Sequence, residues 1–396
     1  MIDLRSIYLE TLERCAPERL VRAVVRSDMP RTAVAIGKCA GALLDGLAAV
    51  HPIDAAFVAV PQGYRNPDTK CEVAIGGHPD YTPASFAAGR KVVEFIAPHD
   101  EILFLISGGG SACVELPLRP WFSESDLSAT NARLLASGIP IGEMNVVRKH
   151  ISAIKGGRLA ASMRGRVVTL IYSDVSSGAL RDVASGPTLP DASTNAGAAS
   201  ILERIGGCES VAAILRRNDV AETVKRNSGS NATLIADNET LTAAAAEVAR
   251  DRGLRAVPWA GQIESDVSEA AVALLERARN LKKDQVLVAG GEPTVVRLGH
   301  GRGGRCSELA LRFVLAAAAS HADGISALFG SSDGLDGNSG AAGVEIDSRP
   351  EGLDGAAIDA ALADSDSFPL APRLGRAIMI PPAGNNVRDL FLLARS

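Results

Sequence analysis

The chain has 396 residues, a formal net charge of −5 and a pI near 5.8, and only 4% of its residues are aromatic. Its acidity and its few stacking side chains argue against a nucleic-acid partner, and its length favours two α/β domains over one core. The N-terminus lacks a secretory signal, no apolar run approaches the roughly 20 residues that span a bilayer, and the six cysteines are scattered. We therefore expect a cytoplasmic protein with reduced thiols and no membrane partner.

Apolar runs alternate with Ala-rich stretches along most of the chain. Strands are expected at 32–37, 101–107 and 166–174 in the first half, and at 232–238, 285–291, 294–299 and 325–331 in the second. Such alternation predicts βαβ units and mainly parallel sheets covered by helices. The polar stretch at 216–231 is the candidate junction, which divides the chain into domains 1–230 and 231–396.

Two Gly-rich turns in the first half carry groups that suit an anion. Lys38 follows one strand and opens a helix, where the positive end of the helix dipole makes a lysine mildly unfavourable unless an anion is present; the alternative is an ordinary solvated lysine. The turn SGGGSA offers consecutive N–H groups and two hydroxyls. Three successive glycines are more than a tight strand–helix turn needs, and each costs backbone entropy on folding. We expect this second turn to bind phosphate or carboxylate through Ser107, Gly108, Gly109, Gly110 and Ser111.

A run of basic residues without a carboxylate follows at 145–158 and contains Arg148, Lys149, His150, Lys155 and Arg158. A solvated basic face is the common explanation of such a run. The alternative is that some of these cations hold an acid substrate or a transferring phosphoryl group.

Four carboxylates follow expected strands: Asp174, Glu292, Asp333 and Asp336. If the strands are parallel, these side chains lie on one rim of a sheet. Magnesium typically takes one or two carboxylates plus phosphate oxygens, so a magnesium site is expected here, although aspartate in a Gly-rich turn is often only a turn former.

The segment RLGHGRGGR contains Gly299, Gly301 and Gly304 in the GxGxxG spacing of dinucleotide-binding turns, so an oxidoreductase has to be considered. His321 stands where the ribose-binding acid of that motif is expected. Arg302 and Arg305 suit phosphate instead, because a planar guanidinium can bind two oxygens at once.

Several longer motifs together resemble the class II glycerate kinases, whose C-terminal part is called the MOFRL domain. They are ISGGGSA, the run from Glu143 through NVVRKHISAIKGGRLA, SDV…ASGPTLPD (173–191), GGEPTVV, GRGGR and DGLDG…AAG, and they occur in order over nearly the whole chain. The resemblance implies two α/β domains, a Rossmann-like three-layer sandwich followed by a domain with the MOFRL region at about 285–392, and an active site in the cleft between them.

The resemblance also implies ATP- and Mg²⁺-dependent phosphorylation of D-glycerate, usually at the 2-hydroxyl, by a monomer or homodimer. Members are often labelled hydroxypyruvate reductases, which is the NAD(P)-dependent alternative; a paralogue acting on another small hydroxy acid is a further one. The catalytic residues implied are Lys38, Asp174, Arg305 and Asp333, with Asp174 and Asp333 as metal ligands. The residues expected to bind ATP or substrate are Ser107, Gly108, Gly109, Gly110, Ser111, Arg148, Lys155, Glu292, Arg302 and Asn385.

Three departures from the family pattern concern substrate choice. Gly178 and Ala179 replace two aspartates after SDV, Cys306 and Ser307 replace Asn-Gln after GRGGR, and PPAGNN stands at 381–386 where the family has Thr-Gly-Pro-Thr-Gly-Thr-Asn. The loss of two carboxylates predicts a weaker preference for glycerate over related 2-hydroxy acids.

Overall fold

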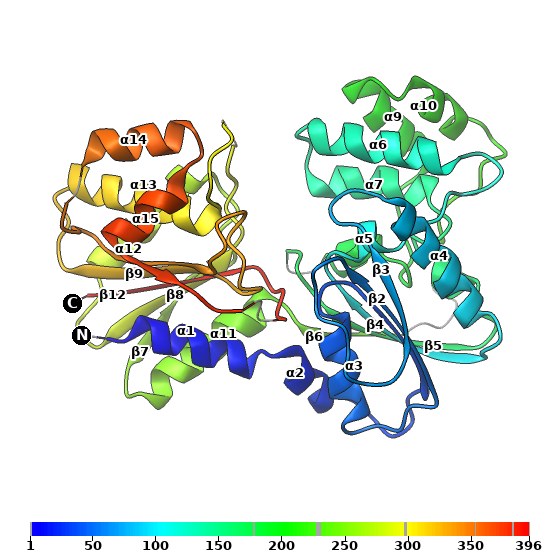
Figure 1. Ribbon diagram of the computed structural model, residues 1–396, viewed down its shortest axis with the longest axis horizontal. Helices are drawn as coiled ribbons and strands as arrows, with labels where there is room; N and C mark the ends of the chain where they lie inside the picture. The colour runs from blue at the N-terminus through cyan, green and yellow to red at the C-terminus, as the bar shows by residue number, and fades with distance from the viewer. Residues whose placement is uncertain are drawn as a thin grey trace. The chain divides into compact units, whose positions relative to one another are not determined.

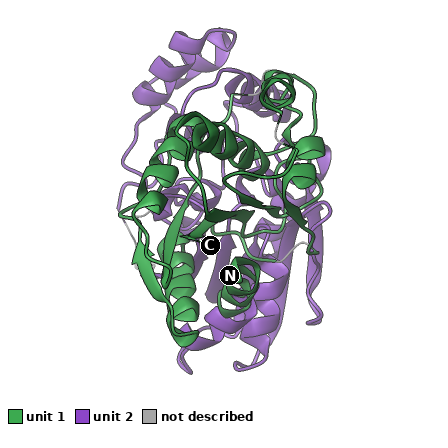
Figure 2. Ribbon diagram, turned by 90° about the vertical axis from the view of Figure 1, so that its left-hand side faces the viewer, with its two compact units in different colours: residues 1–16, 236–396 green, residues 17–235 purple. Residues whose placement is uncertain are grey.

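The computed structural model describes residues 2–176, 179–226, 231–296, 299–352, 354–381 and 384–395. The chain forms two compact units, one of residues 17–235 and one that joins residues 1–16 to residues 236–396 (Figure 2). The division after residue 235 falls next to the expected junction at 216–231. The first 16 residues group with the C-terminal half and not with the N-terminal one.

The unit of residues 17–235 is built on a six-stranded sheet in the order β3-β2-β1-β4-β5-β6 (Figure 1). The strands are β1 (Thr32–Ile36), β2 (Ala55–Pro61), β3 (Glu72–Gly76), β4 (Glu101–Ser107), β5 (Arg166–Tyr172) and β6 (Asn231–Ala236). Strands β1 to β5 pair in parallel, as the alternating pattern predicts. The order is that of doubly wound nucleotide-binding folds, with the chain reversing direction across the sheet between β1 and β4.

Helices cover both faces of this sheet. Val34 of β1 and Phe57 of β2 lie in one hydrophobic core with Val92 of α4 (Pro83–Ile96). The helix α3 (Ala40–Ala48) contacts β1, β2 and β4. Thr82 begins α4 with a capping box and a proline in its first turn. The other helices of the unit are α2 (Pro17–Val24), α5 (Gly110–Cys113), α6 (Glu124–Ala136), α7 (Ile141–Ile151), α8 (Arg158–Ala161), the 3₁₀ helix η1 (Leu180–Ser185), α9 (Asn195–Ile205) and α10 (Glu209–Leu215).

The second unit has a mixed six-stranded sheet in the order β11-β10-β9-β12-β8-β7. The strands are β7 (Arg255–Pro258), β8 (Gln285–Gly291), β9 (Ile325–Ser331), β10 (Gly343–Asp347), β11 (Arg376–Ile378) and β12 (Asp389–Arg395). Among the described strands of this sheet, β7 and β8 alone pair in parallel, because the last strand of the chain inserts antiparallel between β8 and β9, and β10 returns beside β9 without a crossover helix. The expectation of mainly parallel sheets therefore does not extend to this unit.

Two layers of helices enclose this second sheet. The helices α12 (Val267–Arg279), α13 (Arg305–Ala319), α14 (Gly355–Ala363) and α15 (Ser367–Leu374) pack on one face, and α1 (Leu4–Arg14) and α11 (Asn238–Asp251) cover the other (Figure 1). The strand expected at 294–299 is absent from the described part: Thr294 makes an isolated bridge to Asp266, Val296 is exposed, and residues 297–298 lie outside the described residues.

Candidate active site

The two turns predicted to bind an anion interlock at the point where the strand order of the first sheet reverses. Gly37 adopts a φ of +117°, and a Cβ there would lie 2.4 Å from the carbonyl oxygen of Ser107. The Lys38 N–H donates to the Gly108 carbonyl at 2.8 Å, and the Cys39 N–H donates to the Ser107 hydroxyl at 3.1 Å. In open α/β sheets this crevice at the carboxyl ends of the strands is where ligands bind.

The Lys38 side chain lies against the glycine loop. A Cβ on Gly109 would lie 2.9 Å from Lys38 Cγ, so glycine is what lets the lysine pass this close. Lys38 is partly buried, and its Nζ stands 5.6 Å from the centre of the Tyr64 ring, a distance at which a cation is attracted to the ring face. The ammonium is therefore placed beside the loop amides.

The loop itself opens α5 without a side-chain cap. The first N–H groups of a helix have no partner within it, so Gly110 and Ser111 present donors at the sheet edge. The Ser111 hydroxyl meets that of Ser185 at 2.7 Å, and Ser185 donates to the Asn145 side chain at 2.9 Å. Ala184 packs where a Cβ of Gly110 would lie; both Ala184 and Ser185 have positive φ, and such strain is common at functional sites.

Asp174 lies two residues beyond β5, the strand beside β4, and is partly exposed. Of the departures that follow it, Gly178 lies outside the described residues. Ala179 lines a hollow in the same unit together with Leu180, Arg181, Asp182, Leu189, Pro190 and Leu234. A side chain at 179 would therefore border an open space.

The basic run of α7 and the turn after it is buried. Lys155 is 1% exposed and pairs with the equally buried Glu115 at 2.7 Å, and its burial lowers its pKa while Glu115 opposes that change. Lys149 pairs with Asp182 and Asp191, and Arg148 donates twice to Asn131. These cations link segments of the unit to one another. Because their side chains are buried, they do not form the solvated basic face that the sequence allowed. Arg148 and Lys155, which were expected to bind ligand, are thus engaged by Asn131 and Glu115.

In the second unit, Arg305 is the centre of a chain of ion pairs. Its Nε lies 3.1 Å from the fully buried carboxylate of Asp389, and its Nη1 lies 2.8 Å from Glu292. Glu292 also faces Arg388 at 3.5 Å, which in turn pairs with Glu264 at 2.6 Å. Burial raises the pKa of Asp389, against the opposing charge of Arg305. The charge of Asp389 raises the pKa of Arg305, so this guanidinium stays charged.

The two aspartates after β9 have different environments. Asp333 is partly exposed and accepts from the Ser331 hydroxyl and the Leu335 N–H at 2.9 Å each, as in an Asx turn. Asp336 is 3% exposed and accepts from the N–H groups of Cys306 and Ser307 at the start of α13. Asp336 therefore caps a helix, which leaves Asp333 as the carboxylate of this turn that suits a ligand.

The GxGxxG turn is occupied by groups of the protein itself. A Cβ on Gly299, Gly301 or Gly304 would collide with Asp364, Asp366 or Asp336 respectively. The N–H of Arg302 donates to Asp366 and that of Gly303 to Asn338, and the first N–H groups of α13 are taken by Asp336. In a dinucleotide-binding turn these positions receive the pyrophosphate. The resemblance of this turn to that motif is therefore one of sequence only.

Two further expected binding residues are held by neighbours. Arg302 donates to the Ser339 carbonyl at 2.8 Å and stacks on the Phe368 ring at 5.4 Å. Asn385 is 2% exposed, and its amide donates to the Leu12 carbonyl of α1 at 3.0 Å, while its side-chain oxygen has no partner among the described residues. Residues 382 and 383 of the preceding PPAGNN segment lie outside the described residues.

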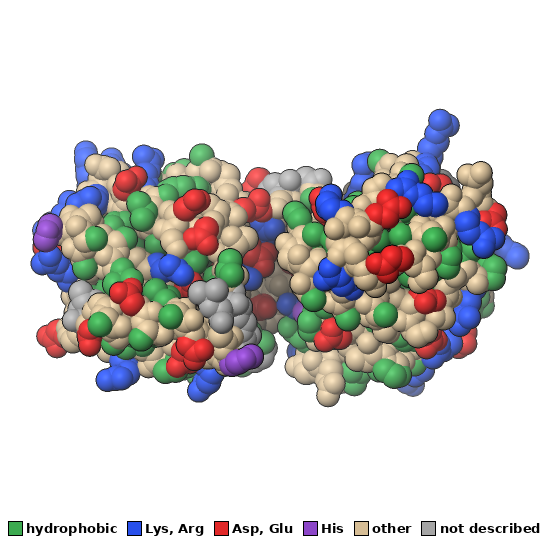
Figure 3. Space-filling view, turned by 90° about the horizontal axis from the view of Figure 1, so that it is seen from above, with side chains coloured by type: hydrophobic (Ala, Val, Ile, Leu, Met, Phe, Trp, Pro, Cys, Tyr) green, Lys and Arg blue, Asp and Glu red, His purple; other side chains and the backbone are tan. Residues whose placement is uncertain are grey.

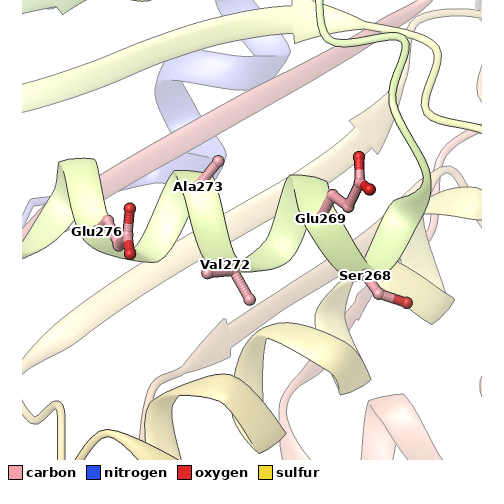
Figure 4. Close-up of a pocket in the computed structure, with 5 residues that line it drawn as sticks. All are labelled: Ser268, Glu269, Val272, Ala273 and Glu276. Carbon is pink, nitrogen blue, oxygen red and sulfur yellow. The ribbon is translucent and has the colours of Figure 1, made fainter.

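The other surface features of the described residues are less suited to binding a phosphorylated ligand. A shallow hollow on the outer face of α12 has Glu269 and Glu276 at its two ends and no cation (Figure 4), which does not suit a phosphorylated ligand. The face shown in Figure 3 intersperses basic and acidic side chains over both units. The described residues contain no cluster of three metal-ligating side chains, and no helix among them is long and apolar enough to cross a bilayer.

Sequence reasoning missed the partners that hold the functional side chains in place. Asp389 is the first residue of β12, Arg388 directly precedes it and Glu264 lies in a loop. Asn145 and Ser185 come from segments far along the chain from the glycine loop that they support. A signal existed for Asp389 alone, as a charged residue that directly precedes the apolar run LFLLA. The contacts of the other residues depend on which segments the fold brings together, and the sequence around them does not predict these contacts.

The first unit is doubly wound and has a lysine and an uncapped glycine loop at its switch point, and the second α/β unit contains a chain of arginines and carboxylates. These features are typical of an α/β protein that handles nucleotides or phosphate. Residues 3–217 match a domain of unknown function, DUF4147, and residues 285–389 match the MOFRL family. The chain is 32% identical to a D-glycerate 2-kinase of Thermotoga maritima, over 98% of this chain and 96% of that protein. It is 36% identical to a protein of Agrobacterium vitis named putative hydroxypyruvate reductase, over 90% and 85% of the two chains.

Solved structures give the same result. A crystal structure of glycerate kinase from Thermotoga maritima superposes with a TM-score of 0.86 at 30% identity, covering 99% of this chain and 98% of that one. The chain belongs to the class II glycerate kinase family, which combines these two regions.

Proposed function

We propose that this protein is an ATP-dependent kinase that phosphorylates D-glycerate, with 2-phosphoglycerate as the product. The observation that carries the proposal is the pair of interlocked turns at the switch point, which puts a lysine beside uncapped amides. Relatives named glycerate 2-kinase and a structure of a glycerate kinase over nearly the full length support the choice of acceptor.

The alternative reaction is a nicotinamide-dependent reduction of hydroxypyruvate, after which some relatives are named. It is disfavoured by the GxGxxG turn, whose glycines face Asp364, Asp366 and Asp336 of this chain and whose amides are already bonded. A pyrophosphate would have to displace these carboxylates.

Phosphoryl transfer needs positioning and charge neutralisation more than covalent chemistry. In the proposed reaction the 2-hydroxyl oxygen of glycerate bonds to the γ-phosphorus of ATP, the bond to the β,γ-bridging oxygen breaks, and ADP leaves. Lys38 and Arg305 neutralise the charge on the moving phosphoryl oxygens. Either Asp174 or Asp333 orients the hydroxyl and takes its proton, and the loop from Ser107 to Ser111 holds phosphate or the substrate carboxylate.

The family implies Mg²⁺ as a cofactor, and the donor set fits it. Asp174 and Asp333 are partly exposed carboxylates at strand ends, and one or two such ligands plus phosphate oxygens are what magnesium commonly takes in phosphoryl-transfer sites. When bound, the ion supplies charge neutralisation to the phosphates. Asp336 and Asp389 are buried against protein donors and do not fit this role.

The direct test is to incubate the pure protein with ATP, Mg²⁺ and D-glycerate, to measure ADP, and to identify the product by ³¹P NMR. NAD(P)H oxidation with hydroxypyruvate is measured in parallel. We expect ADP and 2-phosphoglycerate without nicotinamide turnover. Nicotinamide turnover without ADP release would overturn the proposal.

Removal of divalent cations should abolish the activity, and Asp174→Asn and Asp333→Asn should each impair it, because a neutral amide is a weaker ligand and a weaker base than a carboxylate. The measurements are ADP release in excess chelator and in Mg²⁺ titrations of both variants. Full activity in chelator would refute the metal requirement, and a variant with unchanged rate and unchanged Mg²⁺ dependence would clear that residue of a role.

A further inference from the structure

Asp389 is the buried partner of the arginine that the proposed mechanism uses. It is the first residue of β12, where it lies in register between Gly291 of β8 and Ser331 of β9, and it is 0% exposed. The Asn238 amide donates to the backbone carbonyls of Val387 and Asp389, at 2.8 and 3.1 Å. The carboxylate is therefore fixed on a rigid backbone.

The contacts of Arg305 leave one edge of its guanidinium open. Nε and Nη2 donate to the two oxygens of Asp389 at 3.1 and 3.5 Å, and Nη1 forms an ion pair with Glu292 at 2.8 Å. A guanidinium has five N–H groups in a fixed plane. Asp389 takes the Nε–H and one N–H of Nη2, so N–H groups of both terminal nitrogens remain beside this pair, and 36% of the side chain is exposed. Two parallel donors of this kind match two oxygens of a phosphoryl group.

A cation at this place needs such a partner. Arg305 is the first residue of α13, where the helix dipole disfavours a positive charge. The neighbouring cation, Arg388, is bonded to Glu264 and Gln262, and Asp336 is turned to the helix amides. Within the described residues, Asp389 and Glu292 are thus the only carboxylates that pair with Arg305, and of the two only Asp389 is completely buried.

We propose that Asp389 is a positioning residue, which holds the Arg305 guanidinium in the plane and orientation that present its open edge to the transferred phosphoryl group. This proposal rests on the proposed function of Arg305. Asp389 touches neither ATP nor glycerate and acts only through Arg305, so it should affect kcat more than the KM of either substrate.

A double-mutant cycle tests this dependence. Four proteins are compared: the natural chain, Asp389→Asn, Arg305→Ala and the double variant. Asparagine keeps the shape but puts an N–H where the arginine needs an acceptor. We expect Asp389→Asn to lower kcat on the order of tenfold to a hundredfold and Arg305→Ala to lower it by 10²–10³. The double variant should be no slower than Arg305→Ala, because residues that act as one unit are not additive.

A matched control separates positioning from loss of a buried ion pair. Asp191 is also a buried carboxylate with a cationic partner, Lys149, in the other unit. Any effect of Asp191→Asn on kcat should add to that of Arg305→Ala. If the effect of Asp389→Asn is likewise additive, or falls on thermal stability and KM alone, Asp389 has a structural role and the proposal is overturned.

A second readout does not depend on the substrate. The ¹⁵Nε–H signal of Arg305, assigned by its loss in Arg305→Lys, should be protected from solvent exchange in the natural chain and exchange rapidly in Asp389→Asn, with the signals of α13 unchanged. Inactivity of the natural chain with glycerate would refute the proposed function while this experiment still tests the pairing. A signal that exchanges equally in both proteins would overturn the positioning role, whatever the substrate.

Discussion

Each unit has a proposed catalytic cation, Lys38 in one and Arg305 in the other, that lies where the backbone alone would disfavour it. Lys38 lies two residues before the first residue of α3, and Arg305 opens α13. Positive charge near a helix N-terminus costs a few tenths of a kcal/mol to about 1 kcal/mol, which the surrounding carboxylates offset for Arg305.

Lys38→Ala should therefore lower kcat by 10²–10³ while leaving the fold intact, since removing a positioned transition-state charge commonly costs that much and the side chain is only partly buried. Steady-state kinetics and circular dichroism of the purified variant measure the two effects. Near-normal kcat in the folded variant would remove Lys38 from the catalytic set.

Asp336 gives a pH dependence of stability with a defined sign. Burial raises its pKa to about 6, although the Ser307 hydroxyl and the amides of Cys306 and Ser307 oppose the shift. Between its ordinary pKa of 3.8 and about 6, the folded protein holds a proton that the unfolded chain has lost. The contribution of Asp336 to stability is then full below the ordinary pKa and declines as the pH rises to about 6.

Compared with Asp336→Asn, which cannot titrate, the natural chain should lose up to about 3 kcal/mol of unfolding free energy between pH 4 and pH 7, since one pKa unit corresponds to about 1.4 kcal/mol. Urea unfolding of both proteins at the two pH values measures the difference. A difference that stays constant with pH would show that the hydrogen bonds to the carboxylate outweigh its burial.

At the scale of elements, the basic run shows why charge in a sequence does not report exposure. Helix α7, the turn after it and the first residue of α8 carry four Lys or Arg side chains and His150, and the sheet topology places the turn against Glu115, which lies just beyond α5. Lys155 then has Glu115 at 2.7 Å, the Val114 carbonyl at 3.2 Å and the Tyr81 ring beneath it. The sequence allowed two interpretations of this run, a solvated basic face or a set of ligand-binding cations. Neither interpretation predicts the buried ion pair of Lys155 and Glu115.

Lys155→Ala should destabilise the unit of residues 17–235 by about 3–5 kcal/mol, because it leaves the Glu115 charge buried without its partner. The chain has two tryptophans, Trp121 in this unit and Trp259 in the other, so Trp259→Phe makes Trp121 fluorescence report on this unit in urea. Arg31→Ala removes the exposed pair with Asp54 in the same unit and should cost less than about 1 kcal/mol. Equal small losses in both variants would contradict the assignment of Lys155.

At the scale of the whole molecule, the first helix belongs to the C-terminal unit. Helix α1 buries Leu4, Ile7, Tyr8 and Leu12 in contact with α11, β9 and β12, and the Tyr8 hydroxyl donates to the Ser331 carbonyl at 2.6 Å. Ser331 precedes Asp333 by two residues and bonds it. The chain therefore returns to its own beginning to complete the layer under the second sheet.

Tyr8→Ala should destabilise the unit of residues 1–16 and 236–396 by about 3–5 kcal/mol, as other buried aromatic truncations do. In a Trp121→Phe background, Trp259 fluorescence should show an earlier urea transition. The Trp121 transition, measured in the Trp259→Phe background, should be unchanged. An unchanged Trp259 transition would contradict the packing of α1 on this unit.

The sequence by itself determined the features that depend on local order. Apolar runs that end in glycine or other polar turns located β1, β4, β5, β6, β8 and β9, and the long motifs identified the family. These features can be predicted because hydrophobic periodicity, turn residues and short motifs are each contained in about ten neighbouring residues.

Only the tertiary structure decided which groups meet. The antiparallel insertion of β12 between β8 and β9 brings Asp389 to Arg305, 84 residues away, and the Asp364, Asp366 and Asp336 side chains fill a turn that by its letters alone would bind a dinucleotide. The same holds for Lys155 and Glu115. Residue spacing along a chain carries no information about pairing between distant strands, because that pairing follows from how the sheet buries its two faces.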